Sequence, residues 1–158
     1  MSEPVGTGRP EYRGAALVLS ASLRDRLARH AEAAYPGEAC GALLGSLDRS
    51  KFPTVTRAIP LRNSDPWTGD GYRISVDDLY ELSPEDSSRE ERLVGFYHSH
   101  PDRTARPSER DLRCAVPGLL YVTVSVRAGR AGARIAWIVS PAVAATEDCP
   151  SREGVCRN

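Results

Sequence analysis

The segment from Leu93 to His100 constrains the fold of this chain more than any other segment. Its first six residues, Leu-Val-Gly-Phe-Tyr-His, are mostly apolar and aromatic, which predicts a buried strand. His98 and His100 stand two positions apart at the end of that strand. Side chains alternate between the two faces of a strand, so both imidazoles are expected to point to the same side.

The composition fits one ordinary globular domain and excludes several kinds of partner. The chain has 158 residues, of which 41% are hydrophobic and 27% are charged. Its 21 basic and 21 acidic side chains balance, which argues against a general nucleic-acid or anionic-membrane binder. No apolar run approaches the roughly 18–20 residues that cross a bilayer, and four cysteines are too few for a disulfide scaffold. We therefore expect a cytoplasmic protein with no nucleic-acid partner and no membrane partner.

Strands and helices are expected to alternate along the chain. The first helix is predicted over residues 22–34, where apolar side chains recur on one helical face: Leu23, Leu27, Ala31 and Ala34. Two further helices are predicted at 77–82 and 108–115. Strands are predicted at 15–19, 39–44, 53–62, 72–75, 93–98, 120–126 and 134–139. This order predicts the α/β (α+β) class, with a mixed sheet and helices packed on it.

A helix start follows the histidine pair after a short loop. Pro107 and Ser108 are typical first residues of a helix, and Asp111 lies one turn into it. The loop between the pair and this helix is long enough to let the helix swing back over the strand end. Two imidazoles and one carboxylate would then make an open metal site, with a fourth position for water. Such a metal lowers the pKa of its water to roughly 7 and polarises a carbonyl.

This spacing resembles the signature of the JAMM, or MPN+, metalloproteases. His98–Pro101 and Ser108–Asp111 match the two halves of that signature without a gap. Upstream, Pro36–Gly45 resembles the family's glutamate-bearing segment, and Asn63 with Tyr72–Ile74 resembles its middle segment. The resemblance implies a flexible N-terminus at residues 1–13, a catalytic domain at 14–140 and a C-terminal tail at 141–158.

The resemblance also implies a fold and a chemistry. The fold would be a JAB/MPN-like mixed, curved sheet flanked by helices, layered as in cytidine deaminases. One Zn²⁺ per chain would be held by His98, His100 and Asp111. Glu38 would be the general base that takes a proton from the attacking water and delivers it to the leaving amine. Ser108 would donate a hydrogen bond to the oxyanion, a contribution of about 10²–10³-fold in rate.

The resemblance is closest to the small bacterial members, because the chain is near the length of the minimal domain. These members hydrolyse the bond after the C-terminal Gly-Gly of ubiquitin-like sulfur-carrier proteins and free a cysteine, a peptide or a precursor extension. The Gly-Gly tail would lie as an added strand near the site. Trp67 and Tyr72 are expected to form the walls of its channel. The sequence leaves open whether the chain forms a homodimer and what Cys149 and Cys156 do.

Several other functions are compatible with parts of this sequence. A deubiquitinase-like protease or a non-catalytic MPN-type binding module would share the fold. A two-histidine, one-carboxylate site also suits an iron oxygenase, and His-x-His occurs in cupins, but no histidine follows His100 as a cupin would need. A cysteine hydrolase built on Cys40 or Cys114 would leave the spacing of the two motifs unexplained.

Overall fold

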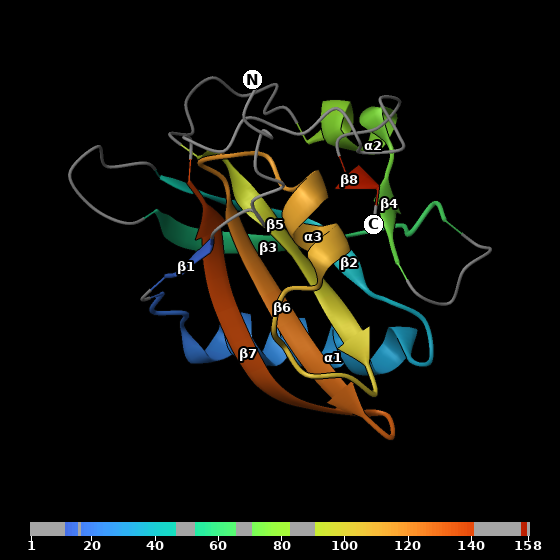
Figure 1. Ribbon diagram of the computed structural model, residues 1–158. Helices are drawn as coiled ribbons and strands as arrows, with labels where there is room; N and C mark the ends of the chain where they lie inside the picture. Colours follow the sequence, from blue (N-terminus) through green and yellow to red (C-terminus); the bar gives the residue numbers. More distant parts are fainter. Residues whose placement is uncertain are drawn as a thin grey trace, which may run out of the picture.

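The computed structural model describes most of the chain as one mixed sheet with helices on both faces (Figure 1). The described residues are 12–15, 17–46, 53–65, 71–82 and 91–140, with the backbone of Cys156–Arg157. The helices are α1 (Ala21–Ala34), α2 (Val76–Glu81) and α3 (Glu109–Cys114). The strands are β1 (Tyr12–Gly14), β2 (Cys40–Ser46), β3 (Thr54–Leu61), β4 (Arg73–Ile74), β5 (Arg92–Pro101), β6 (Leu120–Arg127), β7 (Arg130–Val139) and β8 (Cys156–Arg157).

The main sheet has the strand order β1-β7-β6-β5-β2-β3, and its centre is the strand that carries the histidine pair. Strand β5 pairs in parallel with β6 and antiparallel with β2, whereas all other pairs in this sheet are antiparallel. Gly95 of β5 lies opposite Leu120, and a Cβ at position 95 would overlap the Leu120 carbonyl oxygen. The glycine therefore lets the two central strands approach each other.

Helix α1 covers one face of the sheet (Figure 1). The Ser20 side chain caps it by accepting a hydrogen bond from the Leu23 N–H, and the helix ends before Pro36. Leu23, Leu27 and Ala31 are buried against apolar side chains of the sheet, in agreement with the predicted stripe. The fold class, a mixed α+β sheet flanked by helices, is confirmed.

The opposite face of the sheet carries a second apolar cluster and the short helices α2 and α3. Phe96 of β5 belongs to this cluster, together with Tyr121 and Trp137, whose rings stack at a centroid distance of 4.6 Å. His98 and His100 alternate in phase with Phe96 along β5, so they emerge on this same face. The fold thus directs the histidine pair away from α1 and toward α3.

The predicted first strand at residues 15–19 is wrong. Tyr12–Gly14 forms the edge strand instead, in register with Trp137–Val139. Ala15 adds one hydrogen bond from its N–H to the Ala136 carbonyl, and residues 17–20 have no regular secondary structure. The apolar run then packs only in part, with Leu19 buried and Val18 92% exposed.

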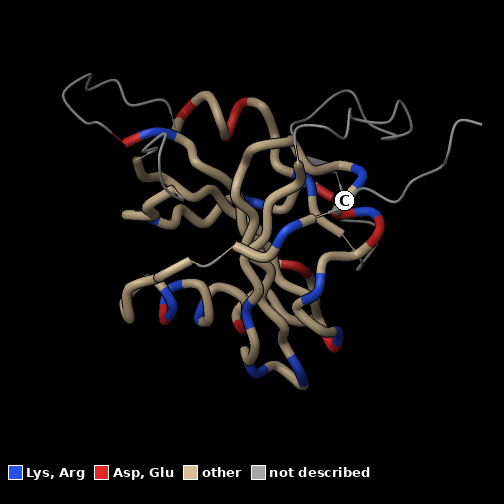
Figure 2. Tube along the Cα trace, turned by 60° about the vertical axis from the view of Figure 1, so that its left-hand side comes forward, with Lys and Arg blue, Asp and Glu red and all other residues tan. Residues whose placement is uncertain are grey.

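The C-terminal segment contributes one described element. Strand β8 pairs antiparallel with β4, Arg73 opposite Arg157 and Ile74 opposite Cys156, in a separate two-stranded sheet. Cys149 lies outside the described residues, and the division of the chain at residues 13 and 140 stays a prediction. Figure 2 shows that basic and acidic residues are interspersed along the described trace. Within the described ranges, no helix is long and apolar enough to cross a membrane.

Candidate metal centre

Two histidines and one aspartate meet where β5 ends and α3 begins. His98 Nε2 lies 3.1 Å from His100 Nε2 and 3.3 Å from Asp111 Oδ1, and His100 Nε2 lies 3.1 Å from Asp111 Oδ2. All three side chains are buried. In the part of the chain that the structure describes, this is the group of side chains that could hold a metal ion.

The spacing of these atoms suits a tetrahedral cation. Ligand atoms about 2.0–2.1 Å from a metal are separated by about 3.3 Å along a tetrahedral edge, close to the 3.1 Å between the two imidazole nitrogens, and one carboxylate oxygen of Asp111 lies within 4.8 Å of both. Imidazole nitrogen and carboxylate oxygen are also donors that zinc accepts. A buried cluster of such atoms is stabilised by a cation or by protons placed between them. The residues present therefore fit a metal.

Neighbouring groups orient each candidate ligand. His100 Nδ1 lies 2.8 Å from the Thr104 carbonyl oxygen, which favours a proton on Nδ1 and leaves Nε2 as the atom that faces Asp111 and can bind a metal. Asp111 accepts a 2.6 Å hydrogen bond from the Ser108 N–H, as the acidic half of a capping box that starts α3. The Tyr72 ring stacks on the His98 ring at a centroid distance of 4.8 Å.

The electrostatics of the cluster follow from burial and from mutual contacts. Burial alone would raise the pKa of Asp111, but the charge of His98 and hydrogen bonds from both histidines hold this pKa well below its usual value. Burial alone would lower the pKa of His100, but its hydrogen bond and charge interaction with Asp111 raise it overall. The carboxylate of Asp111 is thus kept ionised, the state that a metal ligand requires.

Glu38 is held beside this cluster by the chain that follows it. The Ala39 N–H donates to Ser99 Oγ at 2.8 Å, and the Ser99 N–H donates to the Ala39 carbonyl at 2.9 Å. Ser99 stands between the two histidines, so this pair of bonds fixes Glu38 at the end of β5. The Asn63 amide donates to the carbonyl oxygens of Glu38 and Gly71 and ties this segment to the one that carries Tyr72.

The Glu38 carboxylate is buried and paired with an arginine. Its Oε1 accepts a 2.7 Å bond from Arg103 Nη2, and the side chains are 2% and 41% exposed respectively. Burial raises the pKa of Glu38, although the charges of His98, His100 and Arg103 act in the opposite direction. A carboxyl group with a raised pKa is suited to take up a proton and release it again.

Ser108 is the N-cap of α3. Its Oγ accepts a 3.1 Å hydrogen bond from the Asp111 N–H. A hydroxyl that accepts this bond still has its own proton to donate. Because the cap ties Ser108 to Asp111, the hydroxyl is fixed one helical turn from a candidate ligand.

Two residues, Trp67 and Tyr72, are predicted to line a substrate channel, and the structure describes only one of them. Trp67 lies outside the described residues. Tyr72 is 1% exposed and presents its ring to His98, so its contact with the site runs through that imidazole. A substrate contact for either residue stays a prediction.

The sequence reasoning missed one side chain at the site. Arg103 stands in the loop between the two motifs, and nothing in its local sequence marks it out from Arg106 or Arg110. Its pairing with Glu38 joins residues 65 positions apart. The sequence feature that indicates Arg103 is its position, three residues after His100 in the loop that joins the two motifs.

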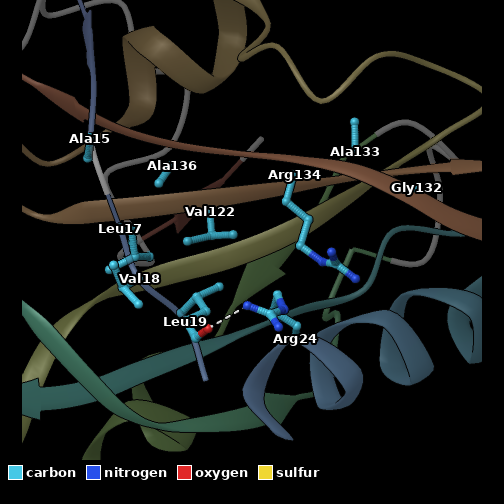
Figure 3. A pocket seen from close by; sticks show the side chains of 10 residues that line it. All are labelled: Ala15, Leu17, Val18, Leu19, Arg24, Val122, Gly132, Ala133, Arg134 and Ala136. Atoms are coloured by element: carbon cyan, nitrogen blue, oxygen red, sulfur yellow. Dashed lines mark hydrogen bonds between the residues drawn. The ribbon is translucent and has the colours of Figure 1, made fainter. Parts of the chain in front are cut away.

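A cavity of about 510 Å³ lies on the other face of the sheet, between the segment after β1, the start of α1 and strands β6 and β7 (Figure 3). Most of its lining is apolar, and Arg24 and Arg134 extend into it. Val122 and Ala136 belong to or pack against the cluster beneath α1, so the sheet separates this cavity from the histidine pair. Its lining has no metal-ligating side chain.

Comparisons with known proteins give matches over most of the chain. A family model for prokaryotic homologs of the JAB domain matches residues 20–139. The chain is 33% identical over 114 residues to a desampylase of Haloferax volcanii, a match covering 69% of this chain and 80% of that protein. It is 34% identical over 112 residues to a CysO-cysteine peptidase of Mycobacterium tuberculosis, covering 70% and 74% respectively.

A solved structure extends the likeness to three dimensions. The solution structure of a protein from Salinibacter ruber has a TM-score of 0.60 and 34% identity to this chain. The match covers 88% of this chain and 95% of that one. The chain belongs to the family of prokaryotic JAB-domain proteins.

Proposed function

We propose that this protein is a zinc-dependent peptidase of the JAMM type that acts on a ubiquitin-like sulfur-carrier protein. The bond cleaved would be the amide that follows the carrier's C-terminal Gly-Gly. The observation that carries the proposal is the buried triad of His98, His100 and Asp111 with Glu38 fixed beside it by the Ala39–Ser99 bonds. Relatives named for desampylase and CysO-cysteine peptidase activity support the substrate class.

The triad would hold one Zn²⁺, which supplies Lewis acidity toward water and toward the scissile carbonyl when bound. Asp111 is kept ionised by its histidine neighbours and by the capping box of α3. Tyr72 keeps the His98 ring in place, and Thr104 sets the tautomer of His100. These contacts fix the ligand atoms before a metal arrives, so little reorganisation is needed on binding.

Glu38 would move the proton that the reaction requires. Water adds to the amide carbon, the C–N bond breaks, and Glu38 carries one water proton to the leaving nitrogen. The second water proton leaves the new carboxyl group and is taken up by the amine, so the products are the carrier carboxylate and an ammonium group, and atoms and charge balance. The Ser108 hydroxyl would donate to the oxygen on which negative charge develops. General-base catalysis of this kind contributes typically about 10²–10⁴-fold in rate.

The Gly-Gly tail would reach the site in extended form and pair with a strand edge. Glycines suit a narrow approach because they carry no side chain that would meet its walls. Trp67 and Tyr72 are proposed to lie along this approach. The balanced net charge agrees with a protein tail as the substrate rather than a nucleic acid. The sparse cysteines support a reducing, cytoplasmic setting.

The test is a zinc-loaded enzyme incubated with sulfur-carrier proteins extended beyond Gly-Gly, followed by intact mass. We expect loss of the extension, full inhibition by a chelator and recovery when zinc is returned. Glu38→Gln keeps the size of the side chain and should lower the rate at least ~100-fold while zinc stays bound. Zinc-loaded protein that releases no extension would favour a binding module, and cleavage of ubiquitin conjugates alone would favour a deubiquitinase-like protease.

A further inference from the structure

Arg103 places a positive charge at the mouth of the site, in contact with the proposed general base. Its guanidinium lies 2.7 Å from Glu38 Oε1. The Arg103 side chain is 41% exposed, whereas the Glu38 side chain is 2% exposed. Arg103 is therefore on the solvent side of the pair, and a molecule that approaches Glu38 from solvent meets the guanidinium.

The backbone beneath Arg103 is fixed from several directions. The Asp102 N–H donates to the Val126 carbonyl at 2.6 Å, and the Ser125 hydroxyl donates to the Arg103 carbonyl at 2.5 Å. The Asp102 carboxylate accepts bonds from the Tyr35 hydroxyl and the Ala128 N–H, both at 2.9 Å. These bonds place the base of the Arg103 side chain accurately, and its side chain is 41% exposed, so solvent reaches its guanidinium end. A carboxylate that arrives from solvent can therefore reach the guanidinium while the loop stays in place.

The position of Arg103 relative to the leaving group follows from the proposed chemistry. Glu38 delivers a proton to the leaving nitrogen, so this nitrogen comes within about 2.6–3.2 Å of a Glu38 oxygen. If the leaving group is a free amino acid, its carboxyl carbon is two bonds from that nitrogen, or about 2.5 Å. A guanidinium in contact with Glu38 is then also within reach of that carboxylate.

We infer that Arg103 is a specificity residue that binds the α-carboxylate of the leaving amino acid, so that the enzyme prefers carriers bearing a single terminal amino acid. This inference rests on the proposed function and narrows its substrate class. On binding, the α-carboxylate takes the place of Glu38 at the guanidinium and leaves the general base unpaired. The guanidinium of Arg103 thus faces a carboxylate both before and after the substrate binds. Glu38 loses its ion pair with Arg103 only when a substrate with an α-carboxylate is bound.

Other leaving groups lack this charge at the required place. In a longer peptide, the carboxyl carbon two bonds from the scissile nitrogen belongs to a neutral amide. In an isopeptide, the leaving nitrogen is a lysine Nζ at the end of a four-carbon stem. Neither offers an anion to Arg103. The relatives' names include both a peptidase for a cysteine adduct and a desampylase, and Arg103 assigns this chain to the former class of leaving group.

The experiment compares two conjugates that differ only in one charge. The probe is CysO, the protein in the mycobacterial relative's name, joined at its C-terminus either to cysteine or to cysteinamide. For the wild-type zinc enzyme, kcat/KM for the acid should exceed that for the amide by about 10–100-fold, the effect of one charge-assisted hydrogen bond. In Arg103→Ala this ratio should fall close to one. In Arg103→Lys part of it should return.

Any effect of Arg103→Ala on Glu38 itself changes the cleavage of both conjugates equally. It therefore cancels in the ratio of the two kcat/KM values. Arg106→Ala is the matched control, since Arg106 is an exposed arginine of the same loop and should keep the wild-type ratio. Equal cleavage of acid and amide by the wild type, or an unchanged ratio in Arg103→Ala, would overturn this inference alone. Failure of the wild type to cleave either CysO conjugate or any other carrier conjugate would overturn the proposed function and this inference with it.

Discussion

Ser99 and Ala39 exchange two hydrogen bonds, one from the Ala39 N–H to Ser99 Oγ at 2.8 Å and one from the Ser99 N–H to the Ala39 carbonyl at 2.9 Å. Ser99 lies between the two histidines in sequence, and Ala39 directly follows Glu38. The Ser99 hydroxyl and the Ser99 N–H together hold the proposed base next to the candidate metal ligands.

Ser99→Ala should separate these two parts of the site. It leaves a buried Ala39 N–H without its acceptor, which costs about 1–3 kcal/mol in the free energy of unfolding. The change should also lower the rate of hydrolysis while the zinc content stays at the wild-type value. Urea unfolding, metal analysis and kinetics on one carrier conjugate check the three parts. Ser22→Ala removes an exposed hydroxyl and serves as the control. Loss of zinc in Ser99→Ala would contradict this division.

His98→Ala should abolish metal binding and leave the fold intact. The cluster would lose one of its three donors, and sites with two donors bind zinc weakly. We expect about one zinc per chain in the wild type and almost none in the variant, measured by mass spectrometry of the metal. Circular dichroism should show an unchanged spectrum. A variant that unfolds would indicate that the metal is structural.

Ser108 has two roles that two substitutions separate. Ser108→Ala should lower the stability by about 1 kcal/mol, because it removes the cap of α3, whereas Ser108→Gly should cost only a few tenths. Both remove the hydroxyl proposed to face the oxyanion, so both should lower kcat by about 10²–10³-fold. Thermal unfolding and kinetics on the same samples give the comparison. Activity that tracks stability across the pair would contradict a direct role in catalysis.

His30 of α1 should make the stability of the fold sensitive to mild acid. Its Nδ1 lies 2.8 Å from the Tyr97 hydroxyl, and burial lowers the pKa of His30 below its usual 6.5. Burial also raises the pKa of Tyr97, so the phenol keeps its proton in the folded state. Because the folded pKa is the lower one, the unfolded chain binds a proton first as the pH falls through 6.5, and the folded state loses stability.

The matched variant is His30→Gln, which can still hydrogen-bond to Tyr97 but does not titrate. Between about pH 7.5 and pH 5.5 the wild type should lose more stability than the variant, by up to about 1.4 kcal/mol per pH unit for one proton. Urea unfolding at both pH values measures the difference. If the free energy of unfolding falls equally in the two proteins, groups other than His30 cause the pH dependence.

The local parts of the fold were readable from the sequence, and the long-range parts were not. The stripe of Leu23, Leu27 and Ala31 predicted α1 because helical periodicity is a local signal. The prediction of an edge strand at 15–19 is wrong because an apolar run indicates burial but does not indicate which strand it pairs with. The strand that pairs with β1 is β7, more than a hundred residues away in the sequence. Arg103 was missed for the same reason, since its partner Glu38 is brought to it by the sheet.

The candidate ligands, in contrast, could be found because they share one short segment. Residues 98–111 contain both histidines and the aspartate, and strand alternation plus a helix cap are enough to predict that they converge. Trp67 could not be judged in the same way, because it lies outside the described residues. The sequence predicts Tyr72 beside the site, but its stacking on His98 is a contact between residues far apart in the sequence, which local patterns do not predict.

The separate origins of ligands and base have a consequence for how such proteins diverge. The metal site belongs to one continuous segment, whereas Glu38 is supplied by a contact between residues 60 positions apart. Substitutions at Glu38 and Ala39 alone would therefore leave the candidate ligands in place and remove the proposed general base. In a related protein, metal binding would show only that the ligand segment is intact. Measured hydrolysis would be needed to show that the general base is also in place.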